Sequence, residues 1–190
     1  MSERQLKRPS RAIGRFEKTN AKAQAFSEDL DKYLDWVNKH LLPCADDLIL
    51  LTIKGHLLIE HLLEVNLNRL LDIDHIPTGN DYGALGFNQK LQLLRTVVEQ
   101  REPKPNADLF LAIARLNETR NQLAHNLKNP QEMEKDIQQF IADYHKRAGT
   151  KPATPVPTAA ELKTCILNLC RFLRDVQLHL LRLEIREQTR

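Results

Sequence analysis

The sequence has little of what β-rich, membrane-spanning or disulfide-bonded proteins require. Its 190 residues include only six glycines, six phenylalanines, three tyrosines and one tryptophan, whereas sandwiches and barrels need aromatic and β-branched strands joined by glycine-rich turns. No uninterrupted apolar run approaches the roughly 18 residues of a membrane-spanning helix. The three cysteines are an odd number and lack the spacing of a metal site, so we expect reduced, mostly buried thiols.

The rest of the composition is that of an ordinary globular protein. Apolar residues make up 42% and charged residues 28% of the chain, and a chain of this length buries enough surface to fold without a disulfide or a structural metal. The N-terminus lacks the apolar segment of a secretory signal. The sequence therefore predicts a cytoplasmic protein with no membrane partner.

Positive charge is concentrated at the N-terminus. Residues 1–22 hold seven basic and two acidic residues, a net charge of +5 in a chain whose total is +3. This pattern predicts a flexible arm over residues 1–24, which either only solubilises the protein or binds the phosphates of a nucleic acid. In the second case, the candidate contacts to RNA phosphate are Arg4, Lys7, Arg8, Arg11 and Arg15.

Apolar residues recur at three- and four-residue steps along most of the remaining chain, which is the helical pattern. The fold class is therefore expected to be all-α, a bundle of about five to six helices. We expect a bundle core over residues 25–147, a proline-rich linker over 148–158 and a long C-terminal helix within 159–190, packed on the bundle or on a partner. The predicted helices cover about residues 25–41, 45–71, 87–100, 107–127, 131–146 and 159–187.

The predicted helix over 107–127 is the most informative. Its apolar stripe passes through Leu116 and Leu123, and the position between them where an apolar residue is expected holds Arg120. A guanidinium group keeps its charge, so on a packed face it requires a carboxylate, a phosphate or a water-filled groove. A neighbouring face of the same helix carries three polar residues four apart, namely Asn117, Asn121 and His125.

The segment RNQLAH, from Arg120 to His125, resembles the signature of the HEPN superfamily: an arginine, a polar residue directly after it, and a histidine four to six residues after the arginine. The motif also lies late in a helical bundle, as it does in that family. The resemblance implies a HEPN-like fold over about residues 25–180 and a metal-independent endoribonuclease that needs no cofactor. It further implies a homodimer with a composite active site.

The resemblance also implies roles for individual residues. The 2′-hydroxyl of RNA is the nucleophile, and the products are a 2′,3′-cyclic phosphate and a 5′-hydroxyl. His125 would act as general acid or base near neutral pH, Arg120 would hold the scissile phosphate, and Asn121 would orient the phosphate or the imidazole. Such an enzyme would serve as a toxin, a phage-defence factor or a stress effector, with an antitoxin or a regulatory protein as a possible partner.

Two structural interpretations compete with this one. Arg120 can form a buried ion pair, with Glu60 as its candidate partner, and His125 can simply cap the C-terminus of its helix. Glu60 and Asn117 are the residues expected to support the site. A similarity of layout to mannitol-repressor-like regulators suggests an alternative function, a non-catalytic interaction protein that keeps the fold.

The predicted helix over 45–71 carries a second cluster of polar residues, His56, Glu60, His61 and Glu64. Their order matches neither the zinc-protease motif nor the paired motifs of di-iron bundles, so we expect an ion-paired or solvated face and no metal. Gly55 lies on the apolar stripe of this helix, where it would permit a neighbouring helix to approach closely.

Overall fold

All the regular structure that the computed structural model describes is helical, which confirms the all-α class. It describes residues 28, 32–33, 35–41, 47–70, 85–101, 107–125, 129–153 and 158–188. The helices are η1 (Val37–Leu41), α2 (Leu48–Leu70), α3 (Phe87–Arg101), α4 (Ala107–His125), α5 (Pro130–Ala148) and α6 (Ala159–Gln188). The arm over 1–24 and its five candidate phosphate contacts lie outside the described residues.

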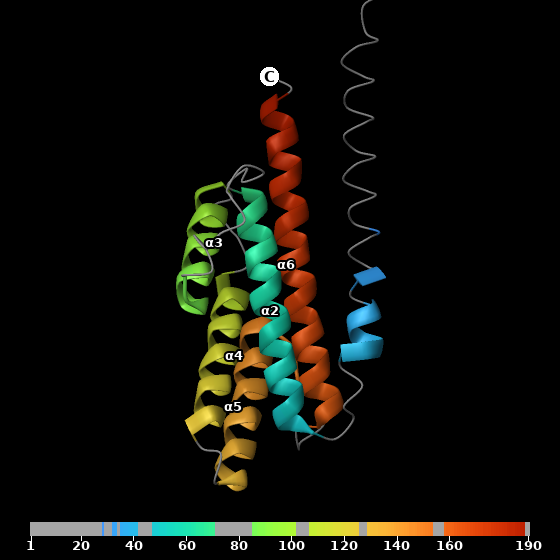
Figure 1. The fold of residues 1–190 in the computed structure, drawn as a ribbon, viewed down its shortest axis with the longest axis vertical. Coiled ribbons are helices and arrows are strands. Elements are labelled where there is room, and N and C mark those ends of the chain that lie inside the picture. The colour runs from blue at the N-terminus through green and yellow to red at the C-terminus, as the bar shows by residue number, and fades with distance from the viewer. Residues whose placement is uncertain are drawn as a thin grey trace, which may run out of the picture.

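Helices α2 to α6 form one bundle (Figure 1). The longest helix, α6, has 30 residues and runs beside α2, while α4 and α5 form an antiparallel pair. α3 lies against α2 and α4. α2 and α4 run in opposite directions, so the first turns of α2 lie at the same end of the bundle as the last turns of α4.

Polar side chains satisfy the backbone at the helix ends. Asp47 accepts a hydrogen bond from the amide of Leu50 (2.9 Å) at the start of α2, and Thr158 accepts one from the amide of Glu161 (3.2 Å) at the start of α6. Asn129 caps α5, whose first residue is Pro130. α5 ends at Gly149, whose φ of 66° is the left-handed conformation that glycine adopts without strain.

Helix α2 comes close to α6 at Gly55, as its place on the apolar stripe suggested. A Cβ atom at Gly55 would lie 2.5 Å from Cδ1 of Ile166, so the absence of a side chain lets the two helices pack at this distance. Ile166 is itself fully buried.

The thiols of Cys165 and Cys170 are free and completely buried in α6, as expected. Burial raises the pKa of each to about 12, so both side chains act as apolar core residues and not as nucleophiles. Cys44 lies outside the described residues. None of the described helices has the length and apolar character needed to cross a membrane.

Candidate functional site

Arg120 and Asn121 form a hydrogen-bonded pair on the surface of α4. Nη1 of Arg120 donates to Oδ1 of Asn121 (3.0 Å), and both side chains are exposed. Within the described part of the chain, no carboxylate forms an ion pair with Arg120. In the described contacts, the guanidinium group therefore has most of its five N–H donors available to a ligand.

The packed stripe of α4 does not pass through Arg120, and the prediction that it does is wrong. The fully buried residue between Leu116 and Leu123 is Thr119, and its hydroxyl donates to the carbonyl of Arg115 (2.9 Å). A helix turns about 100° per residue, so positions 119 and 120 both fit a spacing of three or four. Arg120 therefore lies on the exposed side of α4, where its charge is hydrated and requires no buried partner.

Glu60 does not pair with Arg120, so the closed ion pair weighed as an alternative is also wrong. Nζ of Lys90 donates to Oε1 of Glu60 (3.2 Å) and to Oε1 of Glu64. Lys90 lies on α3, and its side chain is 4% exposed. Sequence reasoning missed this lysine, although its position three residues after Phe87 and four before Leu94, both buried, placed it on the apolar face of α3.

Asn117 is buried beneath the Arg120–Asn121 pair, one turn earlier on α4. Its Oδ1 accepts a hydrogen bond from Nε2 of His56 (2.8 Å), and its Nδ2 donates to Oδ1 of Asn88 on α3 (3.2 Å). The ring of His56 stacks on Phe87, with 4.6 Å between the ring centroids. Asn117 therefore joins α4 to both α2 and α3.

His56 is held in its uncharged form. Burial lowers the pKa of its imidazole, and the positive charge of Arg120 lowers it further. The hydrogen bond to Asn117 and the charge of Glu60 act in the opposite direction without cancelling the shift. Because Oδ1 of Asn117 can only accept, Nε2 of His56 carries the proton.

His125 is the exposed last residue of α4. α4 is continuous from Ala107 to His125, so the side chains of Arg120 and His125 leave the helix about 140° apart. Among the described contacts, Arg120 is joined to Asn121 and not to His125. The alternative that His125 caps the helix stays a prediction, because residues 126–128 lie outside the described part.

The polar cluster of α2 separates into three environments. His56 points into the bundle toward Asn117, Glu60 and Glu64 bind Lys90, and the ring of His61 lies near that of Tyr33, with 6.3 Å between centroids. Across the described residues, no group of three His, Cys, Asp or Glu side chains is placed to hold a metal ion. The expected ion pairing is confirmed for the two glutamates.

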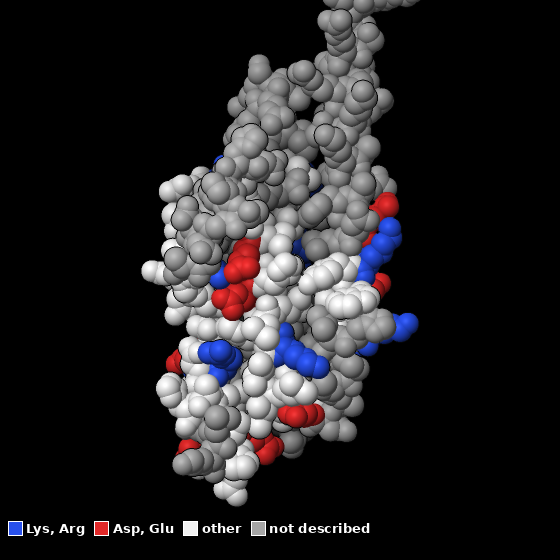
Figure 2. All heavy atoms as spheres, viewed as in Figure 1, with Lys and Arg blue, Asp and Glu red and all other residues white. Residues whose placement is uncertain are grey.

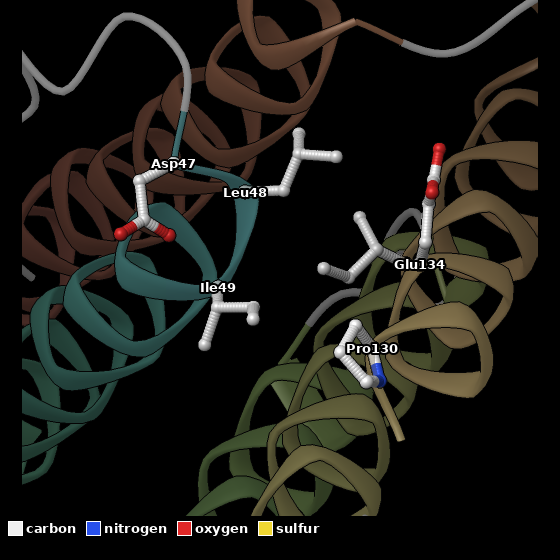
Figure 3. Close-up of a pocket in the computed structure, with 6 residues that line it drawn as sticks. Asp47, Leu48, Ile49, Pro130 and Glu134 are labelled. Carbon is white, nitrogen blue, oxygen red and sulfur yellow. The ribbon is translucent and has the colours of Figure 1, made fainter. Parts of the chain in front are cut away.

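A groove of about 320 Å³ opens between the first turns of α2 and α5. Leu48 and Ile49 face Pro130 across it (Figure 3). Asp47 and Glu134, both exposed, also line it. An apolar floor with two carboxylates repels phosphate, so this groove does not extend the Arg120 site.

The visible surface of the bundle carries basic and acidic side chains in alternation (Figure 2). On this face, the described residues do not merge into one basic surface that would track a long nucleic-acid backbone. On this face, the described basic side chains are therefore individual cations and not a continuous basic patch. No protein-family model, curated protein or solved structure matches this chain.

Proposed function

We propose that this protein is a HEPN-like, metal-independent endoribonuclease that cleaves RNA through the 2′-hydroxyl. The observation that supports this most directly is the state of Arg120. It is an exposed cation on a motif-bearing helix, held by Asn121, and no described carboxylate neutralises it. Such a guanidinium group binds a phosphate group with two parallel hydrogen bonds and stabilises charge that develops on its oxygens.

The reaction requires two proton transfers and no metal. A base removes the proton of the 2′-hydroxyl, the oxygen attacks the adjacent phosphorus, and an acid protonates the departing 5′-oxygen. Histidine is the side chain whose charge changes closest to neutral pH, and His125 is the exposed histidine of the motif. Asn121, fixed by its bond to Arg120, can offer its amide N–H to the same phosphate.

A homodimer would bring together the Arg120 and His125 side chains, which lie on different sides of a single α4. Because Arg120 and His125 leave one helix in different directions, a second copy of the chain is the natural source of a second histidine for the other proton transfer. Each copy would then contribute Arg120 to one half of a composite site. No cofactor enters this scheme.

An exposed apolar stripe on α2 supports such an interface. Leu50, Ile53 and Leu57 share one face of the helix and are 38%, 37% and 55% exposed. The bond between His56 and Asn117 fixes the register of the antiparallel pair α2 and α4, so Arg120, three residues past Asn117, lies level with Ile53. Covering this stripe with a second copy would bury apolar surface next to both motifs.

The biological setting follows from the chemistry as part of the same proposal. A nuclease without a metal requirement acts wherever RNA is present, which in a cell is the cytoplasm. Its activity would have to be restrained, and a toxin, a phage-defence factor or a stress effector with an antitoxin or regulatory partner fits that need. The basic residues of the N-terminal arm would add contacts to RNA phosphate.

The test is cleavage of a labelled RNA by the purified protein in EDTA. We expect fragments with 2′,3′-cyclic phosphate and 5′-hydroxyl ends, and no cleavage where the nucleotide is 2′-deoxy. Arg120→Ala and His125→Ala should each lower the rate at least about 100-fold. Arg171→Ala is the matched control, because Arg171 is also exposed and donates to a neighbouring asparagine, Asn168 (2.9 Å), but on α6.

A non-catalytic helical interaction protein is the second candidate. The exposed stripe on α2 favours it, because such a surface serves a regulatory partner as well as a second copy. Absence of cleavage by wild-type protein, or equal cleavage by wild type and His125→Ala, would contradict the nuclease and favour this candidate.

A further inference from the structure

Three polar side chains from three helices form a hydrogen-bonded chain that runs from the interior of the bundle, at His56 and Asn117, to the exposed side chain of Asn88. His56 of α2 donates to Asn117 of α4 (2.8 Å), and Asn117 donates to Asn88 of α3 (3.2 Å). His56 is 3% and Asn117 7% exposed. The bond between His56 and Asn117 is buried, so keeping it made specifies how α2 and α4 are placed against each other.

His56 is poorly suited to a purely structural role. Its Nδ1 atom is buried, and no described group forms a hydrogen bond with it. An unsatisfied buried acceptor is unfavourable and uncommon in folded proteins. An apolar side chain of similar size would fill the space beside Phe87 without this penalty. What the imidazole provides, and an apolar side chain would not, is the hydrogen bond that its Nε2 donates.

That bond is made one helical turn before the candidate site on α4. Asn117 precedes Arg120 by three residues and Asn121 by four, so all three side chains lie on neighbouring positions of successive turns of α4. Fixing Asn117 therefore fixes the backbone turn from which Arg120 and Asn121 project. Arg120 is also close enough for its charge to act on the imidazole.

We propose that His56 is a positioning residue for the Arg120–Asn121 site, acting through its hydrogen bond to Asn117. This inference rests on the proposed nuclease function for its effect on rate. The role of His56 itself is geometric: an uncharged imidazole that donates from Nε2 holds the turn of α4 that carries Arg120 and Asn121 in a fixed position relative to α2 and α3. Misplacement of a phosphate-binding group by about 1 Å lowers a reaction rate on the order of 100-fold.

Burial, and not the charges around it, keeps His56 in this form: burial lowers the pKa of the imidazole most strongly. Of the two charges that act on the ring, Glu60 on its own helix raises the pKa and Arg120 on α4 lowers it, whereas Lys90 on α3 binds Glu60. A second proton on the imidazole would be placed on Nδ1, where no described acceptor lies. The donor function of Nε2 is therefore maintained at neutral pH.

The first test compares two substitutions of His56. His56→Gln retains an N–H donor for Asn117, and His56→Met fills the space without one. We expect His56→Met to lower kcat about 10- to 100-fold with KM within about twofold, and His56→Gln to remain within about threefold of wild type. Asn66→Leu is the matched control, because Asn66 is a buried polar residue of α2 whose side chain bonds only its own helix in the described contacts (2.8 Å, to the carbonyl of Leu62); it should leave kcat unchanged.

The second test requires no activity. In ¹⁵N NMR spectra, wild-type His56 should be the neutral tautomer protonated on Nε2, and the Nε–H signal of Arg120 should shift in His56→Met and return in His56→Gln. If wild-type protein cleaves no RNA but these signals behave as described, the nuclease proposal fails and the positioning role stands. If kcat and the Arg120 signal are the same in His56→Met as in wild type, the positioning role is wrong. Should His56→Met fail to fold, Asn117→Leu, which removes the acceptor of the same bond, must shift the same signal, and no shift would overturn the proposal.

Discussion

Lys90 binds Glu60 across the interface of α3 and α2, with 3.2 Å between Nζ and Oε1. Burial lowers the pKa of Lys90, but the hydrogen bonds to Glu64 and Glu60 outweigh it, and the pKa is raised overall. The lysine therefore stays charged in the interior. Because Glu60 pairs with Lys90, it is not the partner of Arg120 that the sequence suggested.

Lys90→Met should destabilise the protein by about 2 kcal/mol at pH 7, since it removes two charge-assisted hydrogen bonds and leaves two carboxylates four residues apart. A raised lysine pKa means that this stabilisation is present in full below the unfolded-state value of about 10.4 and is lost only as the pH rises through the folded-state value. The measurement is urea unfolding of wild type and Lys90→Met at pH 7 and at a pH above about 10.4, where the difference between the two proteins should shrink. Lys135→Met, at an exposed position of α5, should change stability by less than about 0.5 kcal/mol; an equal effect would contradict the assignment.

Gly55→Ala should destabilise the protein by about 1 kcal/mol. The new methyl group would meet Ile166 at 2.5 Å, and overpacking of about 1–3 kcal/mol exceeds the roughly 1 kcal/mol that alanine gains over glycine within a helix. In an Ile166→Ala background, the same substitution should instead be neutral or stabilising, because the opposing side chain is gone. Thermal unfolding of the four proteins in this cycle measures the change of sign.

Gly149→Ala provides the contrast for that cycle. Gly149 has a φ of 66° and open space around its Cα, so alanine there is unfavourable through backbone strain alone. Ile166→Ala should not relieve it. If Ile166→Ala changes the loss of stability caused by Gly55→Ala and by Gly149→Ala equally, the close approach of α2 and α6 is not the reason why Gly55→Ala is destabilising.

Much of the fold could be predicted because its signals are local. The apolar period of 3.6 and the breaks at Asn129 and Pro130 predicted a helix over about 107–127 and another over about 131–146. They correspond to Ala107–His125 and Pro130–Ala148. Period and capping residues are properties of short windows, so they can be read without knowing which helices pack together.

The candidate site could be predicted only in part, because its contacts depend on how the helices dock. The sequence identified Arg120, Asn121 and Asn117 as polar residues of one helix, and the structure joins Arg120 to Asn121 and buries Asn117. Whether position 119 or 120 is buried is decided by the neighbours of α4, which periodicity does not specify. The partner of Asn117, His56, lies 61 residues away.

Glu161→Ala should destabilise the junction of α5 and α6 by about 2–3 kcal/mol. The buried carboxylate accepts from the amide of Ala153 (2.7 Å) and contacts Nε2 of His145 (3.1 Å). His145 also bonds Thr150 (2.8 Å). Limited proteolysis should therefore cut faster within residues 149–158. Glu161→Gln keeps an acceptor for Ala153 and should lose less stability; equal losses in both variants would show that the charge, and not the acceptor, is what matters.

Stability should fall on acidification through His56. Because the folded-state pKa of this imidazole is lowered, chiefly by burial, the unfolded chain binds a proton more readily than the folded protein does. The free energy of unfolding is therefore highest above the unfolded-state pKa of about 6.5 and declines as the pH falls from there toward the folded-state value, with a slope of at most about 1.4 kcal/mol per pH unit for this one group.

Denaturant unfolding of wild type and His56→Gln between pH 5 and 8 isolates this effect. Glutamine does not titrate, so the stability of wild type relative to His56→Gln should be greatest near pH 8 and decrease toward pH 5. Asn66→Leu is the control, because Asn66 is a buried polar residue of the same helix that does not titrate, and this substitution should leave the slope of the wild-type curve unchanged. A difference between wild type and His56→Gln that is constant across this range, or that grows on acidification, would mean that the folded protein accepts the proton at His56 as easily as the unfolded chain, and that the imidazole is not held neutral beneath Arg120.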